Sequence, residues 1–142
     1  MFNDALASDY LKRAGHRLKA LQVLMAEESW ADVVRESQEL VEITLKALLR
    51  AARIEVPRVH DVSPLLEQNR DILPAGIRPH VDELVSISRF LRRDRELAFY
   101  GSEDLTPSEF YTREDAATAL GHATFVYTEV FKAMKESVEK QS

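Results

Sequence analysis

The chain contains no cysteine. This absence excludes disulfide bonds, thiolate zinc sites and cysteine nucleophiles. The sequence also lacks any run of about 18 apolar residues, so it predicts no membrane-spanning helix. Its first residues, MFNDALASDYLKRAGHRL, lack the long apolar core of a secretory signal. Together these absences lead us to expect a cytoplasmic protein with no membrane contact.

Glycine and proline are scarce, with 4 Gly and 5 Pro among 142 residues. The glycines stand singly, so the chain has no phosphate-cradling loop and no dinucleotide-binding motif. The 4 histidines form no HExxH motif, and Glu-x-x-His pairs of the di-iron bundle type are also missing. A lone histidine is more typical of a surface or capped position than of a catalytic one. We therefore expect neither a metal site nor a cofactor.

The balance of charge is mildly acidic, with a formal net charge of −5. This balance argues against a surface built mainly to neutralise nucleic-acid phosphates. Residues 92–95, RRDR, are the candidate for a local basic patch. Apolar residues make up 45% and charged residues 30% of the chain, an ordinary composition for a globular protein. The length predicts one helical domain over residues 1–142.

Apolar residues recur at three- and four-residue steps in four long segments, the pattern of amphipathic helices. The segments run over residues 3–28, 29–53, 78–100 and from 112 to beyond 138. The second segment has the widest apolar face, so we expect it at the centre. No segment alternates apolar and polar residues as a strand would. The pattern predicts an all-α fold, an antiparallel four-helix bundle with an additional short helix.

Local signals mark where these helices begin and end. Asn3 is a plausible N-cap, and Ser63 before Pro64 predicts the N-cap of a short helix that reaches about residue 69. Gly101 is a natural stop for the third long helix. The acidic stretch 102–111 is predicted to be a loop. Residues 112–115, Thr-Arg-Glu-Asp, resemble a capping box with Asp at the position where Glu or Gln is usual.

Residues 92–101, RRDRELAFYG, combine charge and aromatic residues at the end of the third long helix. Residues seven apart differ by only about 20° around a helix axis, so Arg93 and Tyr100 share a face. A guanidinium there can hold a phosphate, and a phenol can stack on a base or bond to it. The alternative is a charged helix end, whose surface ion pairs contribute about 0–1 kcal/mol each. Periodicity alone leaves both interpretations open.

The chain resembles the HEPN family, small all-α domains found in prokaryotic toxin–antitoxin pairs and defence systems. The run SQELVEITLKALLRAARIEVPR, which leads into residues 59–61, is similar to the corresponding sequence of small prokaryotic members. The order of long and short helices is also similar. The family motif is an Arg, often followed by Asn, Asp or His, then a His four to six residues on; some members add a Tyr two beyond. Arg93, Asp94 and Tyr100 match this motif, whereas Ala98 stands where the histidine would be.

In HEPN ribonucleases the resemblance implies metal-independent RNA cleavage, with Arg and His from two protomers meeting across a dimer interface. Ala98 cannot carry a proton, and Tyr100, with an ordinary pKa of about 10, is a poor base. General acid–base catalysis contributes about 10²–10⁴-fold, so its loss should leave little activity. The resemblance therefore implies a non-catalytic or weakly active homodimer that binds a nucleotide, RNA or a partner. Its binding site would consist of Arg93, Asp94, Arg95 and Tyr100, with Arg92 as an electrostatic helper.

The family also implies a partner protein. In related toxin–antitoxin pairs a small nucleotidyltransferase can adenylylate the tyrosine beside the motif, which makes Tyr100 a candidate acceptor. Four aromatic residues are candidates for the homodimer contact, although burial in the core would explain each of them equally well. They are Trp30, Phe90, Phe99 and Phe110.

Two alternatives differ in class from this binding module. One is a metal-independent ribonuclease that has recruited another base, with Arg93 as its candidate catalytic residue. His60 could supply that base, but we interpret it as a structural histidine that anchors its loop. The other alternative is an interaction bundle whose arginines only solvate a helix end. The missing motif histidine favours a protein that is not an enzyme.

Overall fold

The computed structural model describes residues 4–58, 61–100 and 106–141, and for residues 4, 94–100 and 137–141 it describes the backbone alone. The regular elements within these ranges are all helical. The α-helices are α1 (Asp4–Ala26), α2 (Trp30–Ala51), α3 (Ser63–Gln68), α4 (Val81–Tyr100), α5 (Pro107–Phe110) and α6 (Arg113–Gln141). Two 3-10 turns, η1 (Arg70–Ile72) and η2 (Arg78–His80), join α3 to α4. The predicted all-α fold is confirmed.

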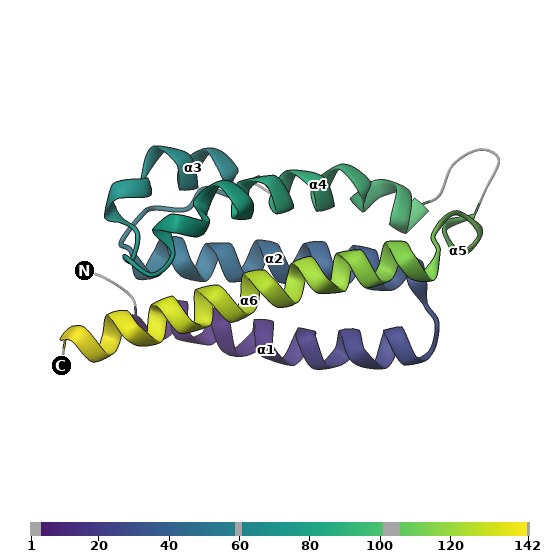
Figure 1. The fold of residues 1–142 in the computed structure, drawn as a ribbon, viewed down its shortest axis with the longest axis horizontal. Helices are drawn as coiled ribbons and strands as arrows, with labels where there is room; N and C mark the ends of the chain where they lie inside the picture. The colour runs from purple at the N-terminus through teal and green to yellow at the C-terminus, as the bar shows by residue number, and fades with distance from the viewer. Residues whose placement is uncertain (1–3, 59–60, 101–105, 142) are drawn as a thin grey trace.

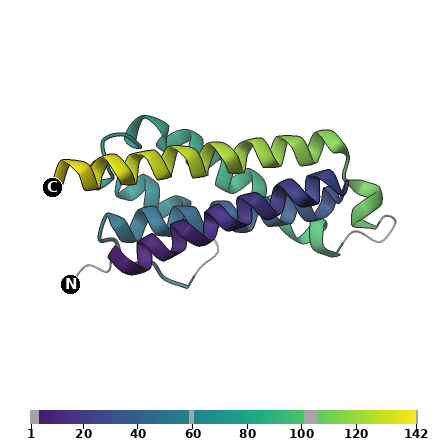
Figure 2. The same cartoon turned by 90° about the horizontal axis from the view of Figure 1, so that it is seen from below.

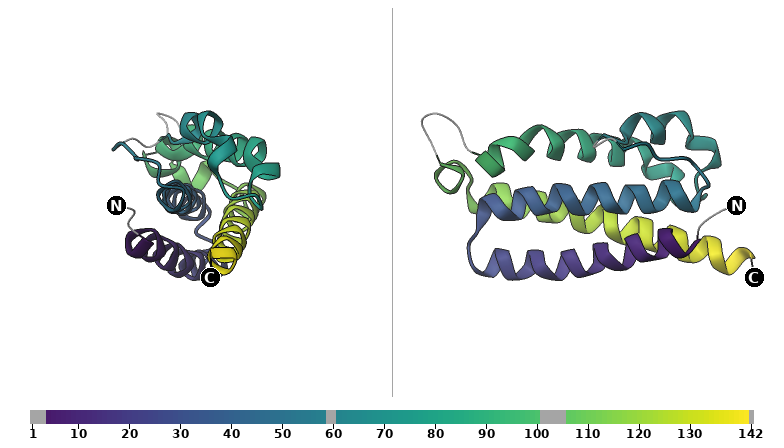
Figure 3. Two further views of the ribbon diagram at one scale, coloured as in Figure 1. Left: turned by 90° about the vertical axis from the view of Figure 1, so that its left-hand side faces the viewer. Right: turned by 180° about the vertical axis from the view of Figure 1, so that it is seen from behind.

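The four long helices form an antiparallel bundle around α2. Figure 1 shows α2 between α1 and α4, and α6 runs alongside α2 and contacts α1 as well. Figure 3 shows the same arrangement from the end of the bundle and from behind. The short helix α3 packs on α4 at one end of the bundle, whereas α5 lies at the other end. The central position predicted for the second helix is confirmed.

The core consists of aliphatic side chains from all four long helices. The apolar face of α2 supplies the largest share, and its residues Val33, Leu40, Leu45, Leu48 and Leu49 have no exposed surface. Burying a side chain of this size stabilises a fold by about 1.5–3 kcal/mol. The facing helices contribute Leu21 from α1, Leu84 and Leu91 from α4, and Val126 and Val130 from α6. The predicted apolar stripes therefore face the core.

Several helix ends differ from the predicted ones. The helix α4 begins at Val81 rather than at residue 78, because the 3-10 turn η2 occupies Arg78–His80. The prediction that Ser63 caps α3 is wrong, because Val62 is the cap residue and Ser63 is the first helical residue. The Asp61 carboxylate instead accepts a hydrogen bond from the Ser63 backbone N–H at 3.0 Å. The prediction of a loop over 102–111 is wrong at Pro107–Phe110, where α5 forms. Asn3 and Gly101 lie outside the described residues.

The ends of α1 and α2 and the start of α6 have clear local causes. Glu28 and Arg53 have φ of 62° and 63°, a left-handed conformation that stops α1 and α2 about two residues earlier than predicted. The predicted capping box at 112–115 is confirmed. The Thr112 N–H donates to Asp115 Oδ2 at 2.9 Å, and the Asp115 N–H donates to Thr112 Oγ1 at 3.2 Å.

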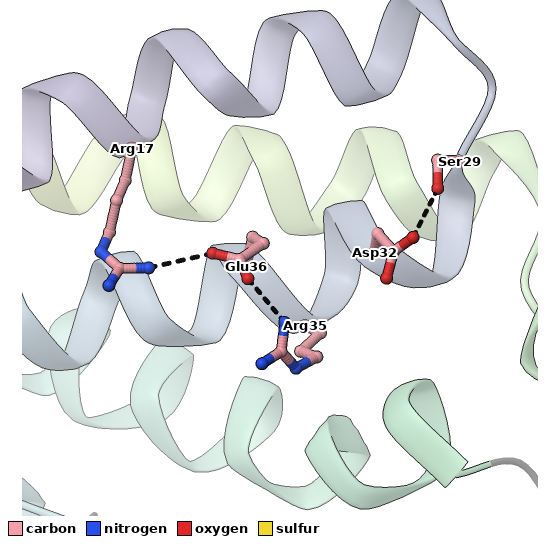
Figure 4. A network of polar contacts seen from close by, with 5 residues as sticks. All are labelled: Arg17, Ser29, Asp32, Arg35 and Glu36. Carbon is pink, nitrogen blue, oxygen red and sulfur yellow. Dashed lines mark hydrogen bonds and ion pairs between the residues drawn. The ribbon is translucent and has the colours of Figure 1, made fainter.

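A polar network joins α1 to α2 (Figure 4). Arg17 on α1 donates to Glu36 Oε2 at 3.0 Å, and Arg35 donates to the other oxygen, Oε1, at 2.6 Å. The Glu36 side chain is 25% exposed, so its carboxylate is partly shielded from water. At the start of α2, Ser29 Oγ donates to Asp32 Oδ2 at 2.7 Å. The Arg17–Glu36 contact joins the two helices, whereas the other two contacts lie within α2 or at its start.

Candidate functional site

The stretch that the sequence singled out lies in the second half of α4. The helix continues without a break to Tyr100, as predicted. Arg92 and Arg93 are exposed on its surface. The side chains of Asp94, Arg95, Ala98 and Tyr100 lie outside the described ones, and so does the whole of residue His60. Arg93 is therefore the motif residue whose side chain the structure describes.

Arg93 lies against an aromatic ring one turn earlier on α4. Its guanidinium carbon is 5.1 Å from the centre of the Phe90 ring. The Phe90 side chain is 39% exposed, which is high for a large apolar group. Its ring also meets the imidazole of His122 on α6 edge to face, with 5.6 Å between centres and 74° between planes. A cation, an aromatic face and an imidazole are thus assembled at one place, where α4 meets α6.

Beside this cluster a groove of about 580 Å³ runs along α4 towards α3. Arg93, Phe90 and Arg89 line it, together with the acids Glu67 and Asp82. Each of these acids has its own arginine. Arg89 donates to Glu67 at 3.0 Å, and Arg70 donates to Asp82 at 2.5 Å. The acidic side chains in the groove are therefore already paired with cations.

The arginines of α4 also influence a carboxylate that precedes α3. Partial burial raises the pKa of Asp61, but hydrogen bonds from Ser63 and the charges of Arg92 and Arg89 outweigh this effect. The pKa of Asp61 consequently lies below its ordinary value. Asp61 is therefore electrostatically linked to the arginines of α4.

We call the exposed surface formed by Arg89, Phe90, Arg92 and Arg93 the α4 arginine face. Guanidinium groups bind phosphate oxygens through paired hydrogen bonds, and an exposed aromatic ring can stack on a nucleobase. The chemistry of this face is therefore that of a phosphate- and base-binding surface. Among the residues that the structure describes, no three His, Asp or Glu side chains gather in a way that would hold a metal ion.

His122 is the one residue of this cluster that the sequence gave no reason to choose. It stands alone on α6, 32 positions after Phe90, and forms no motif with neighbouring residues. Its place beside Phe90 depends on how α4 and α6 align when they pack, which no local pattern reveals. Of the other aromatic candidates, Phe110 is 42% exposed, Trp30 is half-buried under Arg113, and the Phe99 side chain lies outside the described ones.

Comparison with known proteins adds one finding. The sequence model of the HEPN domain matches residues 7–136, which is nearly the whole chain. No curated protein and no solved structure matches it. Within the described part of the chain, no helix is long and apolar enough to cross a membrane.

Proposed function

The chain belongs to the HEPN domain family, and on this basis we propose that it is a dimeric, non-catalytic or weakly active module that binds RNA or a nucleotide through the α4 arginine face. The observation that carries the proposal is the exposed pair of Arg93 and Phe90, with a guanidinium carbon 5.1 Å from the ring centre. The matching cationic and aromatic groups suit a phosphate and a base of one nucleotide. Asp94, Arg95 and Tyr100, on the following two turns of α4, complete the proposed site.

Two features support binding rather than catalysis. Ala98 occupies the position of the motif histidine, so proton transfer from that position is lost. The acids that line the groove, Glu67 and Asp82, are already paired with Arg89 and Arg70, so they oppose a phosphate less than free carboxylates would.

The experiment measures RNA binding and cleavage by the same protein. A labelled single-stranded RNA is titrated with the wild type, with Arg93→Ala and with Arg13→Ala, a control at an exposed arginine on α1. In chelator we expect binding by the wild type with little cleavage, and an affinity about fivefold or more lower in Arg93→Ala alone. Equal binding by all three proteins would exclude the α4 arginine face as the RNA site, and no binding by any of them would favour a purely structural bundle.

Dimerisation is part of the proposal, because HEPN sites are normally shared between two protomers. Phe90 is the apolar member of the α4 arginine face, and its exposed ring can extend into such a contact. Light scattering at micromolar protein is expected to give twice the mass of one chain. A monomer under these conditions would remove the shared site.

A nucleotidyltransferase partner belongs to the same proposal, with Tyr100 as the acceptor of an adenylyl group. Tyr100 is the last residue of α4, seven positions after Arg93, so the two share one face of the helix. After co-expression with a transferase encoded beside this chain, the intact mass should rise by one adenylyl group. The rise should disappear in Tyr100→Phe, and an unmodified wild type would refute this part.

A second function, a metal-independent ribonuclease, is favoured by the position of His122. Its imidazole touches the same Phe90 ring that Arg93 covers. In such a reaction His122 would take the proton of a ribose 2′-hydroxyl while the oxygen attacks phosphorus and the P–O5′ bond breaks. Water would then protonate the leaving 5′-oxygen, and the other product would be a 2′,3′-cyclic phosphate. RNA cleavage in chelator that is lost in both Arg93→Ala and His122→Asn, but kept in Arg13→Ala, would establish this function in place of simple binding.

A further inference from the structure

A second surface with mixed chemistry lies between α1 and α6. Figure 2 shows these two helices side by side, with α4 behind them. A hollow of about 700 Å³ opens along their contact, and a smaller one of about 350 Å³ adjoins it and shares Tyr127 and Phe131. The combined space is of the size that small-ligand sites have. We call it the α1–α6 cleft; its main residues are Lys12, His16, Lys19, Tyr127, Phe131 and Lys135.

An aromatic pair forms the wall of the cleft on α6. The rings of Tyr127 and Phe131 stack with 5.8 Å between centres and 30° between planes. Phe131 is 41% exposed, so part of its ring faces the open space. A nucleobase can stack on an exposed aromatic ring regardless of its sequence identity, because every base has a π-face.

The opposite wall holds the Tyr127 phenol in place. A Cβ at position 15 would lie only 2.8 Å from the Tyr127 hydroxyl oxygen, so the phenol rests where only glycine leaves room. Gly15 lies inside α1, where glycine costs roughly 1 kcal/mol relative to alanine. Gly15 therefore has a structural role, because its lack of a side chain lets the aromatic pair pack against α1.

The charge in the cleft is opposite to that of the whole chain. Four lysines line it, although the chain carries a formal net charge of −5. Lys132 lies 4.0 Å from Glu129, whereas Lys12, Lys19 and Lys135 have no carboxylate partner among the described residues. The Lys135 ammonium lies 5.9 Å from the centre of the Phe131 ring. Glu136 is the acid that faces this surface.

From these observations we infer that the α1–α6 cleft is a second binding site, for a nucleotide whose base stacks on Phe131 and whose phosphate lies between Lys12 and Lys135, with Lys19 adding positive charge to the same surface. The nucleotide can be free or can be one unit of single-stranded RNA, since both present the same base and phosphate. This inference does not rest on the proposed function, because the cleft contains none of the residues of the α4 arginine face.

The test follows backbone amide signals of the ¹⁵N-labelled full chain during titration with adenosine 5′-monophosphate. Signals of α1 and α6 around Lys12–Lys19 and Tyr127–Lys135 should shift. Adenosine, which lacks the phosphate, and ribose 5-phosphate, which lacks the base, should each bind more weakly. A five-residue oligoadenylate run in parallel distinguishes the two sources, since tighter binding of the oligomer indicates an RNA strand and equal binding a free nucleotide.

Matched variants give the decisive comparison. Phe131→Leu keeps the apolar bulk and removes the ring, and Phe110→Leu does the same at a ring of similar exposure on α5. We expect about a fivefold or larger loss of nucleotide affinity in Phe131→Leu and none in Phe110→Leu. Lys12→Ala should weaken binding and the neighbouring Arg13→Ala should not, while Arg93→Ala should leave these shifts unchanged.

Three results would each overturn the inference. They are the absence of shifts in the cleft, equal binding of ribose 5-phosphate and the nucleotide, and unchanged affinity in Phe131→Leu. Loss of the cleft signals in Arg93→Ala would assign nucleotide binding to the α4 arginine face instead. Failure of RNA binding at the α4 face with intact shifts in the cleft would refute only the proposed function.

Discussion

The guanidinium of Arg93 lies over the ring of Phe90, with 5.1 Å from its carbon to the ring centre. A contact of this kind at an exposed site is worth about 0.5–1 kcal/mol, enough to bias the arginine towards one orientation. Phe90 therefore has two roles in the proposed site. It positions the cation, and its exposed face offers a surface on which a base can stack.

Replacing Phe90 tests the contribution of the ring to RNA binding separately from that of the arginine charge. In Phe90→Ala we expect RNA affinity to fall about fivefold or more, because stacking is lost, while the slope of affinity against salt stays the same. In Arg93→Ala the slope should decrease by about one ion, since a phosphate contact is removed. Fluorescence anisotropy at several salt concentrations measures both quantities, with Phe110→Ala as the control. A changed slope in Phe90→Ala would mean that the ring acts only through the arginine.

Gly15 and Gly121, which both lie inside long helices, should respond in opposite ways to substitution by alanine. Nothing lies within 4 Å of a Cβ at Gly121, so Gly121→Ala should raise the free energy of unfolding by up to about 1 kcal/mol. Gly15→Ala should gain nothing or lose stability, because its Cβ would meet the Tyr127 hydroxyl at 2.8 Å. Urea denaturation measures both. Adding Tyr127→Phe to Gly15→Ala should restore the gain, and equal stabilisation by the two single variants would contradict the close approach.

The Thr44 hydroxyl should be dispensable for stability. Thr44 is fully buried in α2, and its Oγ1 has no hydrogen-bond partner in the part of the chain that the structure describes. Replacing a buried unpaired hydroxyl by a methyl group removes a desolvation cost, so Thr44→Val should stabilise the fold by roughly 1 kcal/mol. The neighbouring Leu45→Ala should instead cost about 2–5 kcal/mol. Chemical denaturation that showed Thr44→Val to be clearly destabilising would reveal a partner for the hydroxyl.

Acid should remove the contribution of Asp61 to stability. Its pKa is lowered in the folded chain, so the ionised form stabilises the fold at any pH above the unfolded pKa of about 4. This contribution is lost as the pH falls through the lower folded pKa. Because Asp61 is partly exposed, Asp61→Asn should cost less than about 1 kcal/mol at neutral pH. Denaturation at pH 7 and at pH 3 should show the gap between the two proteins narrowing in acid; a constant gap would exclude ionisation as its cause.

The sequence predicted the bundle because apolar periodicity directly reflects which side of each helix is buried. Leu21, Leu48 and Leu91 lie in the predicted amphipathic segments, and all three are buried. Short helices could not be predicted from apolar periodicity. The four-residue helix α5 is too brief to show a period, although its start was readable, since Thr106 and Glu109 form a capping box around Pro107.

The candidate sites were less predictable than the fold. Arg93 was identified from a motif that lies within one helix. The contact of Phe90 with His122 and the facing of Lys12 towards Phe131 each join helices far apart in sequence. Such contacts depend on the axial alignment of packed helices, which follows from the fit of many side chains rather than from any spacing.

The central position of α2 has a consequence for how the protein opens. Each of the other long helices rests on it, so its amide protons cannot meet solvent unless the bundle around them separates. Hydrogen exchange in the middle of α2 therefore reports global unfolding, whereas α1 and α4, on opposite sides of it, are free to open separately. The α1–α6 cleft and the α4 arginine face lie at opposite sides of the bundle, and both border α6, so α2 and α6 together support the two sites.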